Sequence, residues 1–206
     1  MSKYDIGGSQ GRYQSGSNDT VLENKLEITE ASDMDEAELV LLEKLYEAVL
    51  FENLPQSEIT VDEIKTWHRR WLGNVYEWAG EERSVNMSKG TFQFAAAAQI
   101  SQLLNKFEQD FLKQYTPCTG FSLEQLIEAV AIVHIEFILI HPFRDGNGRL
   151  SRLLADVMAV QAGYQPLDYS CWDQNKPEYF AAIGQGMSMD YEAMKGWVNR
   201  AISEPD

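Results

Sequence analysis

Residues 122–152, SLEQLIEAVAIVHIEFILIHPFRDGNGRLSR, contain the most apolar part of the chain and the glycine-rich stretch that follows it. On a helix, one face of this segment carries Leu126, Val130, Val133, Phe137 and Ile140, and the other faces carry Ile127, Ile132, Ile138 and Leu139. A helix that is apolar nearly all round is buried at the centre of a domain. Polar side chains interrupt the run at Glu128, His134, Glu136 and His141, so the segment predicts a core helix and not a membrane span.

Amphipathic patterns on both sides of this segment predict further helices. Apolar residues recur at intervals of three and four over residues 34–51, 60–74 and 96–114, and again from Leu150 towards Gly163. Thr60 is suited to cap the second of these helices, in which Ile64, Trp67, His68 and Trp71 face inward. One or two more helices are expected around Tyr179 and Trp197.

A single β-hairpin is predicted. Val85 and Met87 alternate with polar residues before Lys89-Gly90, and Phe92 and Phe94 do so after it. The fold class is therefore all-α with one small hairpin. Residues 1–20 are rich in Gly, Ser, Asn and Gln and are expected to form a loosely ordered arm.

Composition restricts the function. The chain has 206 residues, enough for one domain, and a net charge of -15 with only 17 Lys and Arg. Binding to nucleic acid or to an anionic membrane needs clustered basic residues, so both are disfavoured. Two cysteines form no disulfide framework, and the start, MSKYDIGGSQ, lacks the apolar run of a secretory signal. We therefore expect a cytoplasmic protein.

The negative charge is concentrated in residues 27–63, which contain twelve Asp or Glu and one base, Lys44. A solvated helix face is the simpler interpretation of this segment. The alternative is a docking surface for a basic partner.

Residues 141–149, HPFRDGNGR, combine the elements of a phosphate site. Pro142 stops the core helix, so His141 is held at a rigid helix end where a base can be positioned. Gly146 and Gly148 bracket Asn147, and such a run can take positive φ angles and turn its N–H groups into a nest for anions.

Charged side chains complete this predicted site. The nest opens onto the N-terminus of a helix beginning near Arg149, whose partial positive charge favours phosphate. Arg149 and Arg152 add two guanidinium groups for phosphate oxygens. Asp145 supplies a hard oxygen ligand suited to Mg²⁺.

The stretch HPFRDGNGRLSR, residues 141–152, matches the signature H-P-F-x-D/E-G-N-G-R-x-x-R of the Fic family at every fixed position. SVNMSKGTFQFA, residues 84–95, resembles the Fic flap hairpin. WHRRWLGNVYEWAGEER, residues 67–83, resembles the helix before the flap. VLENKLEI, residues 21–28, resembles the N-terminal segment of compact, stand-alone Fic proteins of the bacterial cell-filamentation type. The resemblance implies an arm over residues 1–30 and a Fic domain over 31–206, with the flap at about 83–95.

The resemblance also implies a reaction, protein adenylylation, in which AMP passes from ATP to a Tyr, Thr or Ser hydroxyl of a target protein. His141 would be the base and Asp145 would hold Mg²⁺. The nucleotide would contact Lys89, Gly90, Gly146, Asn147, Gly148, Arg149 and Arg152. Phe143 would anchor the loop in the core, and the flap would clamp the target segment by strand addition.

Alternatives to this function remain open at the level of the sequence. A Fic-fold enzyme can use another nucleotide or act as a kinase, although the kinase branch departs from G-N-G-R, which this chain keeps. A catalytically silent binding module would usually show a broken signature.

Many Fic proteins are restrained by a helix bearing S/T-x-x-x-E-G/N, whose Glu pairs with the second signature arginine, here Arg152. The chain contains no complete copy of this motif; the incomplete matches end at Glu36, Glu52 and Glu192. We therefore expect inhibition in trans by a small antitoxin-like protein, as in a toxin–antitoxin pair.

Other polar and aromatic residues are assigned to the core. His68 and His134 are expected to be buried structural histidines. Glu136 is expected to be a buried carboxylate that supports its surroundings. The aromatic residues expected in the core are Trp67, Trp71, Tyr76 and Trp78.

Overall fold

The computed structural model describes residues 9–90 and 92–202. Its helices are α1 (Ala31–Tyr46), α2 (Val61–Leu72), α3 (Ile100–Phe107), α4 (Lys113–Tyr115), α5 (Leu123–Ile140), α6 (Asn147–Gln161), α7 (Ser170–Gln174), α8 (Lys176–Gln185) and α9 (Glu192–Ala201). Strands β1 (Ser88–Lys89) and β2 (Phe92–Gln93) form an antiparallel hairpin. The all-α fold with one small hairpin is confirmed.

Helix α5 is the central element. Its N-terminus carries a capping box, in which Ser122 Oγ accepts the N–H of Gln125 and Gln125 Oε1 accepts the N–H of Ser122. The helix packs against α6 on one side and α9 on another, and α3 also contacts it. Most of its apolar residues are buried, as the all-round apolar pattern predicts, whereas Leu123 in its first turn is exposed.

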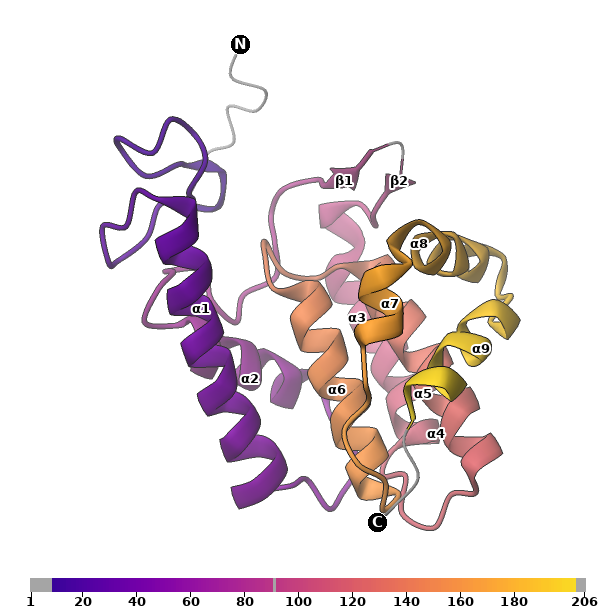
Figure 1. The fold of residues 1–206 in the computed structure, drawn as a ribbon. Helices are drawn as coiled ribbons and strands as arrows, with labels where there is room; N and C mark the ends of the chain where they lie inside the picture. Colours follow the sequence, from indigo (N-terminus) through magenta and orange to yellow (C-terminus); the bar gives the residue numbers. More distant parts are fainter. Residues whose placement is uncertain (1–8, 91, 203–206) are drawn as a thin grey trace.

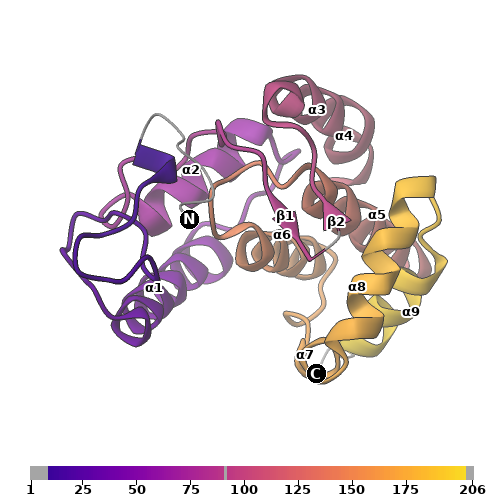
Figure 2. The same cartoon turned by 90° about the horizontal axis from the view of Figure 1, so that it is seen from above.

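The remaining helices form two groups about this centre. Helices α1 and α2 pack against each other on one side of α6, and α7, α8 and α9 lie on the other side (Figure 1). The hairpin lies above the ends of α5 and α6 when the molecule is seen from above (Figure 2). The loop between α5 and α6, which contains residues 141–146, is at this same end.

Two predicted helices contain irregular turns. The first predicted helix continues from α1 into a π-helical segment, Glu47–Glu52. The third begins with a short 3-10 turn at Ala97–Gln99 and contains a π segment at Glu108–Leu112 between α3 and α4. The cap of α2 is confirmed, because Thr60 Oγ1 accepts the N–H of Glu63.

The N-terminal segment differs from its prediction. Within residues 9–30, the side chains of Gln10, Ser17, Val21 and Asn24 are buried, and Lys25 N donates to Val75 O at 2.8 Å. The loosely ordered arm expected for residues 1–20 is thus wrong for residues 9–20, where polar side chains satisfy the turns of the backbone. Residues 1–8 lie outside the described part of the chain.

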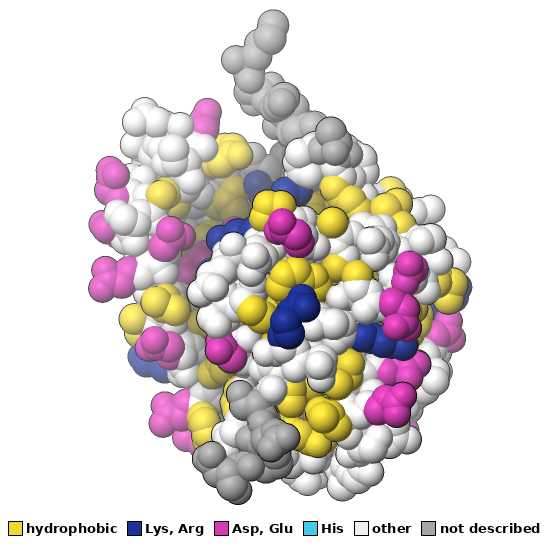
Figure 3. All heavy atoms as spheres, turned by 45° about the vertical axis from the view of Figure 1, so that its right-hand side comes forward, with side chains coloured by type: hydrophobic (Ala, Val, Ile, Leu, Met, Phe, Trp, Pro, Cys, Tyr) yellow, Lys and Arg dark blue, Asp and Glu magenta, His cyan; other side chains and the backbone are white. Residues whose placement is uncertain are grey.

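Charged residues lie mostly at the surface. The face drawn in Figure 3 carries acidic side chains towards its two edges and only isolated basic groups. Among the described residues, no helix is long and apolar enough to cross a membrane. In α1, however, Glu38 is buried while Leu39 is 54% exposed, which reverses the order expected of an amphipathic helix.

Candidate active site

A cavity of about 730 Å³ lies between the hairpin, the loop after α5, the start of α6 and helices α7 and α8. All predicted site residues line it: Lys89, Gly90, His141, Asp145, Gly146, Asn147, Gly148, Arg149 and Arg152. The fold therefore brings together in one cavity residues that the sequence places in two separate segments.

His141 is the C-cap of α5 and has a left-handed backbone, with φ 52°. Its ring stacks on Phe94, with 3.7 Å between ring centroids, so the hairpin segment covers one face of the imidazole. Its Nδ1 is buried with no hydrogen-bond partner among the described residues. Burial, together with the charge of Arg83, lowers the pKa of His141 to about 4. The imidazole is therefore neutral at pH 7 and able to accept a proton.

The loop after His141 is fixed by Phe143 and Asn147. The ring of Phe143 is buried and stacks on His68 at 4.0 Å, which confirms its predicted place in the core. The side chain of Asn147 accepts the N–H of Phe143 at 2.9 Å and donates to its carbonyl at 2.8 Å. Asn147 thus closes the loop with its side chain, and only its backbone remains for a phosphate.

His68 supports the loop from below. Its Nδ1 accepts the N–H of Gly80 at 2.8 Å, so the proton is on Nε2, which donates to the carbonyl of Asp145 at 3.1 Å. Burial lowers the pKa of His68 to about 4, so this tautomer is neutral. The predicted structural role of His68 is confirmed, and the residue joins α2 to the signature loop.

The two signature glycines have different conformations. Gly146 has φ 81°, and a Cβ there would lie 2.7 Å from Cζ3 of Trp71. Gly148 has no positive φ; it lies in the first turn of α6, and a Cβ there would meet nothing within 4 Å. The expected nest with positive φ at both glycines is therefore wrong at Gly148, because α6 begins at Asn147 and not near Arg149. The N–H groups offered to an anion are those of the first turn of α6.

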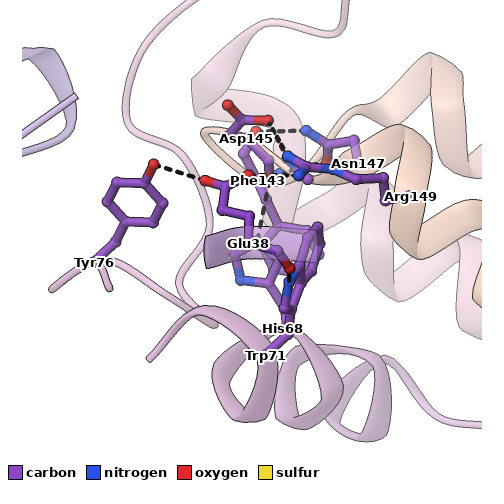
Figure 4. A network of polar contacts seen from close by, with 9 residues as sticks. Glu38, His68, Trp71, Tyr76, Phe143, Asp145, Asn147 and Arg149 are labelled. Atoms are coloured by element: carbon purple, nitrogen blue, oxygen red, sulfur yellow. Dashed lines mark hydrogen bonds and ion pairs between the residues drawn. The ribbon is translucent and has the colours of Figure 1, made fainter. Parts of the chain in front are cut away.

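Arg149 lies between two carboxylates (Figure 4). Its Nη1 is 2.5 Å from Oε2 of Glu38, and its Nη2 is 3.2 Å from Oδ1 of Asp145. Glu38 also accepts the hydroxyl proton of Tyr76 at 2.7 Å and, through its backbone carbonyl, the indole N–H of Trp71 at 2.9 Å. Glu38 was expected on a solvated face; it is buried because this network satisfies its carboxylate.

Arg152 is held by residues near α7. Its two terminal nitrogens donate to the two carboxylate oxygens of Asp173, at 3.1 and 2.7 Å. Its guanidinium group lies over the ring of Tyr169, whose hydroxyl also donates to the buried Asp156. A bidentate pair fixes the plane of the guanidinium group at the edge of the cavity.

The hairpin closes the cavity on its outer side. Lys89 and Phe92 are paired across it, and Gly90 has φ 61°, which suits the turn. Lys89 Nζ lies 4.0 Å from the centre of the Phe180 ring on α8. The flap is thus in contact with the opposite wall, while Thr91 lies outside the described residues.

The other residues assigned to the core are buried as predicted, except that Glu136 is only half-buried. His134 is buried, and its Nε2 is 2.7 Å from the hydroxyl of Tyr179. Glu136 accepts the hydroxyl proton of Tyr191, and burial raises the pKa of its carboxylate. All four aromatic residues assigned to the core are buried: Trp67, Trp71, Tyr76 and Trp78.

Three residues around the site were not predicted. Glu38 lies within the acidic segment, where its sequence neighbours give no sign that it is buried. Asp173 contacts Arg152 across 21 positions of sequence. Arg83 is buried beneath the flap, at the start of the segment, about residues 83–95, that carries the flap. No periodic pattern marks these residues, because each is defined by a partner distant in the sequence.

Comparison with a family model matches residues 58–159 to the Fic/DOC family. This range extends from just before α2 into the last turn of α6 and includes the whole signature. Among curated proteins, the "Probable protein adenylyltransferase Fic" of Salmonella typhimurium is 30% identical over 141 residues, 66% of this chain and 66% of that protein.

One further curated relative and one solved structure extend the match. The "Probable protein adenylyltransferase y4lH" of Sinorhizobium fredii is 26% identical over 182 residues, 88% of this chain and 91% of that protein. Among solved structures, the BepC protein of Bartonella tribocorum, with bound AMPPNP, has a TM-score of 0.76 at 22% identity, covering 98% of this chain and 100% of that chain. This last likeness is one of fold.

Proposed function

We propose that this chain, which belongs to the Fic/DOC family, is a protein adenylyltransferase that moves AMP from ATP to a hydroxyl group of a target protein. One observation carries the proposal: a neutral, half-buried His141 and the N-terminus of α6 with its two arginines line the same cavity. A base and an anion site in one enclosure are what transfer of a charged nucleotide to a hydroxyl requires.

His141 acts as the general base. Its neutral imidazole takes the proton of a Tyr, Thr or Ser hydroxyl, and the hydroxyl oxygen forms a bond to the α-phosphorus of ATP. The bond from that phosphorus to the bridging oxygen breaks, and pyrophosphate leaves. The proton then passes from the imidazole to solvent. Stacking on Phe94 and the rigid helix end keep the imidazole in place during this step.

The N–H groups of the first turn of α6 bind the phosphates, assisted by Arg149 and Arg152. Both arginines are already oriented by carboxylates, Arg149 by Glu38 and Arg152 by Asp173. Orientation before binding reduces the entropy lost when the nucleotide is bound. Gly148 leaves the approach to these N–H groups open.

Mg²⁺ is the cofactor that fits this site. Asp145 has one carboxylate oxygen, Oδ1, engaged by Gly146 and Arg149, and no described residue donates to Oδ2. Residues 9–90 and 92–202 contain no cluster of three acidic, His or Cys ligands, which suits a cation held by one carboxylate and the phosphates of a nucleotide. When bound, Mg²⁺ would neutralise phosphate charge.

The target protein binds at the flap. The hairpin is short and, among the described residues, its strands form a sheet with each other only, so an extended segment of the target can add to it by backbone hydrogen bonds. Lys89 and Gly90, at the tip, cover the nucleotide below. This mode of binding depends more on the backbone of the target than on its sequence.

The enzyme is further proposed to act in the cytoplasm as the toxin of a toxin–antitoxin pair. Both cysteines, Cys118 and Cys171, are free thiols, as suits a reducing compartment. The three glutamates of the incomplete inhibitory motifs, Glu36, Glu52 and Glu192, are exposed, and the described partner of Arg152 is Asp173. An antitoxin-like protein supplying the missing glutamate is therefore the expected inhibitor.

Labelled ATP tests the function. Incubated with a cell lysate and Mg²⁺, the chain should transfer label from the α position of ATP to protein and none from the γ position. His141→Ala should lower transfer by about 10²–10⁴-fold while ATP still binds. Label from the γ position would identify a kinase. Absence of transfer from any nucleoside triphosphate would identify a binding module.

A further inference from the structure

Arg83 is almost completely buried, 1% exposed, yet no carboxylate of the described residues lies within ion-pair distance of it. Its guanidinium group donates instead to four backbone carbonyls. Nε donates to His141 at 2.6 Å, Nη1 to Val85 at 2.5 Å, and Nη2 to Ala95 at 2.6 Å and Ile140 at 3.3 Å. Burying a cation whose partners are carbonyl groups and not a carboxylate costs free energy of folding. The location of Arg83 therefore points to a role beyond packing.

The four carbonyls belong to two parts of the site. Val85 and Ala95 stand at the two ends of the segment that carries the flap, one before β1 and one after β2. Ile140 and His141 form the end of α5. The backbone N–H of Arg83 also donates to Pro142 at 2.8 Å. Arg83 therefore connects both ends of the flap segment to the residue that carries the base.

The end of α5 gains from this contact in two ways. The last carbonyls of a helix have no intrahelical donor, and Arg83 supplies donors to two of them. Its positive charge also lies at the negative end of the helix dipole. His141 has a left-handed backbone, which is unfavourable for a residue with a side chain, and the hydrogen bond to its carbonyl helps to hold that conformation.

We propose that Arg83 is a positioning residue of the transfer reaction, which holds the His141 backbone and both ends of the flap segment as one unit. The proposal rests on His141 being the base. A displacement of about 1 Å between a base and its substrate can cost a factor of 10² in rate. Arg83 keeps the base and the flap-bound hydroxyl at a constant separation without touching either substrate.

Two substitutions separate the hydrogen bonds of Arg83 from its charge. Arg83→Met removes both, and Arg83→Lys keeps the charge but cannot reach four carbonyls with a planar fork. The matched control is Lys65→Met, which removes a cation bound to Glu82, the residue adjacent to Arg83, at 2.8 Å. Lys65 forms no hydrogen bond or ion pair with His141 or with the described residues of the flap; its partner is Glu82.

The expected result is a fall in kcat of about 10²-fold for Arg83→Met, with KM for ATP changed by less than about threefold, because the anion site at α6 is untouched. Arg83→Lys should lose kcat by about tenfold or more. Lys65→Met should behave as wild type. Circular dichroism and ATP calorimetry check that each variant is folded, and Arg83→Lys serves where Arg83→Met does not fold.

A second readout is independent of turnover. The pKa of His141 can be measured by NMR titration of the protein without substrates. Comparison with His141→Ala assigns the signal of this histidine. The charged groups that face it are Arg83 and Lys89, which lower its pKa, and Asp145, which raises it. The His141 pKa should rise in Arg83→Met and stay near the wild-type pKa in Arg83→Lys, which keeps the charge.

The outcomes are distinguishable. If wild type transfers no label but the titration shifts as expected, the proposed function fails and the contact between Arg83 and His141 stands. If wild type is active and Arg83→Lys, folded, has wild-type kcat, the positioning role is wrong. If Lys65→Met and the Arg83 variants lose kcat equally, the loss reflects a general effect on folding, and the positioning role of Arg83 is again wrong.

Discussion

Glu38 Oε2 lies 2.5 Å from Nη1 of Arg149, although 111 positions separate the two residues. The contact joins α1 to the first turn of α6, so the N-terminal helix takes part in orienting a signature arginine. The carboxylate is buried, while the Arg149 side chain is 36% exposed at the cavity. Such a pair adds little net stability, but the loss of one partner leaves a charge without compensation.

Glu38→Ala should therefore destabilise the fold and reduce transfer. We expect a loss of about 2–4 kcal/mol in the free energy of unfolding by urea, because Tyr76 and Arg149 both lose a partner. Glu43→Ala, on the exposed side of the same helix, is the matched control and should cost less than about 0.5 kcal/mol. A rise in transfer in Glu38→Gln would mean that Glu38 withholds Arg149 from ATP and does not position it.

The two signature glycines should respond differently to substitution. Gly146→Ala places a Cβ against the buried ring of Trp71 and demands φ 81° of alanine, so we expect a loss of about 2–4 kcal/mol in stability. Gly148→Val should change stability by less than about 1 kcal/mol, because its side chain meets open space. It should still lower ATP affinity at least about tenfold by filling the approach to α6.

Urea unfolding and ATP calorimetry on both variants test this difference. Gly146→Ala as stable as wild type would contradict the close contact with Trp71. Wild-type ATP affinity in Gly148→Val would place the phosphates away from the first turn of α6. The sequence alone predicts a positive φ at both glycines and therefore similar losses of stability in both variants. Unequal losses would support the conformations seen in the structure.

Stability should fall as the pH is lowered from 6.5 to about 5. Burial lowers the pKa of His68, His134 and His141 to about 4 in the folded chain, below the 6.5 of an ordinary histidine. Between these values the unfolded chain binds more protons than the folded chain, so acidification favours unfolding. Their contribution is complete above pH 6.5 and is lost as the pH falls through 4.

Asp156 opposes this trend, because burial raises its pKa to about 6 from 3.8, and its folded form binds the extra proton in part of the same range. Asp156→Asn should therefore make the stability of the fold decrease more steeply as the pH is lowered. Thermal unfolding of wild type and Asp156→Asn at pH 7 and pH 5 shows whether acidification lowers the melting temperature and whether the variant loses more. A melting temperature that rises on acidification would contradict the lowered pKa and neutral state of the three histidines.

Much of the site was predictable because its residues are adjacent in sequence. His141, Asp145 and Arg149 follow one another on a helix end, a loop and a helix start, and local rules for helix ends and glycines are sufficient to place them together. The hairpin is predicted by the alternation on either side of Lys89-Gly90, although Val85 and Met87 lie outside its strands. The conformation of Gly148 was not predictable, because a helix can begin one or two residues earlier or later without any change in the apolar pattern.

The partners of the signature arginines were not predictable for a different reason. Glu38 and Asp173 each contact an arginine across a long sequence separation, and neither interrupts a periodic pattern. The acidic segment, residues 27–63, shows why such partners could not be predicted from sequence. Its composition indicates solvated carboxylates, which holds for Glu36 and Glu43, but the single buried one is selected by packing against α2 and α6.

Regulation provides the last prediction. Expressed alone in a bacterial host, the chain should modify itself and arrest growth, because no glutamate within residues 9–90 and 92–202 pairs with Arg152. Arg152 pairs with Asp173, and a bidentate pair at the cavity edge leaves its charge available for exchange with a phosphate. Glu36→Gly, Glu52→Gly and Glu192→Gly should leave activity unchanged, since all three side chains are exposed and the carboxylate paired with Arg152 is that of Asp173. Automodification with α-labelled ATP and growth curves measure both effects, with His141→Ala as the inactive control. A silent wild-type chain that any of the three glycine substitutions activates would mean that the inhibitor is internal and that no antitoxin-like partner is needed.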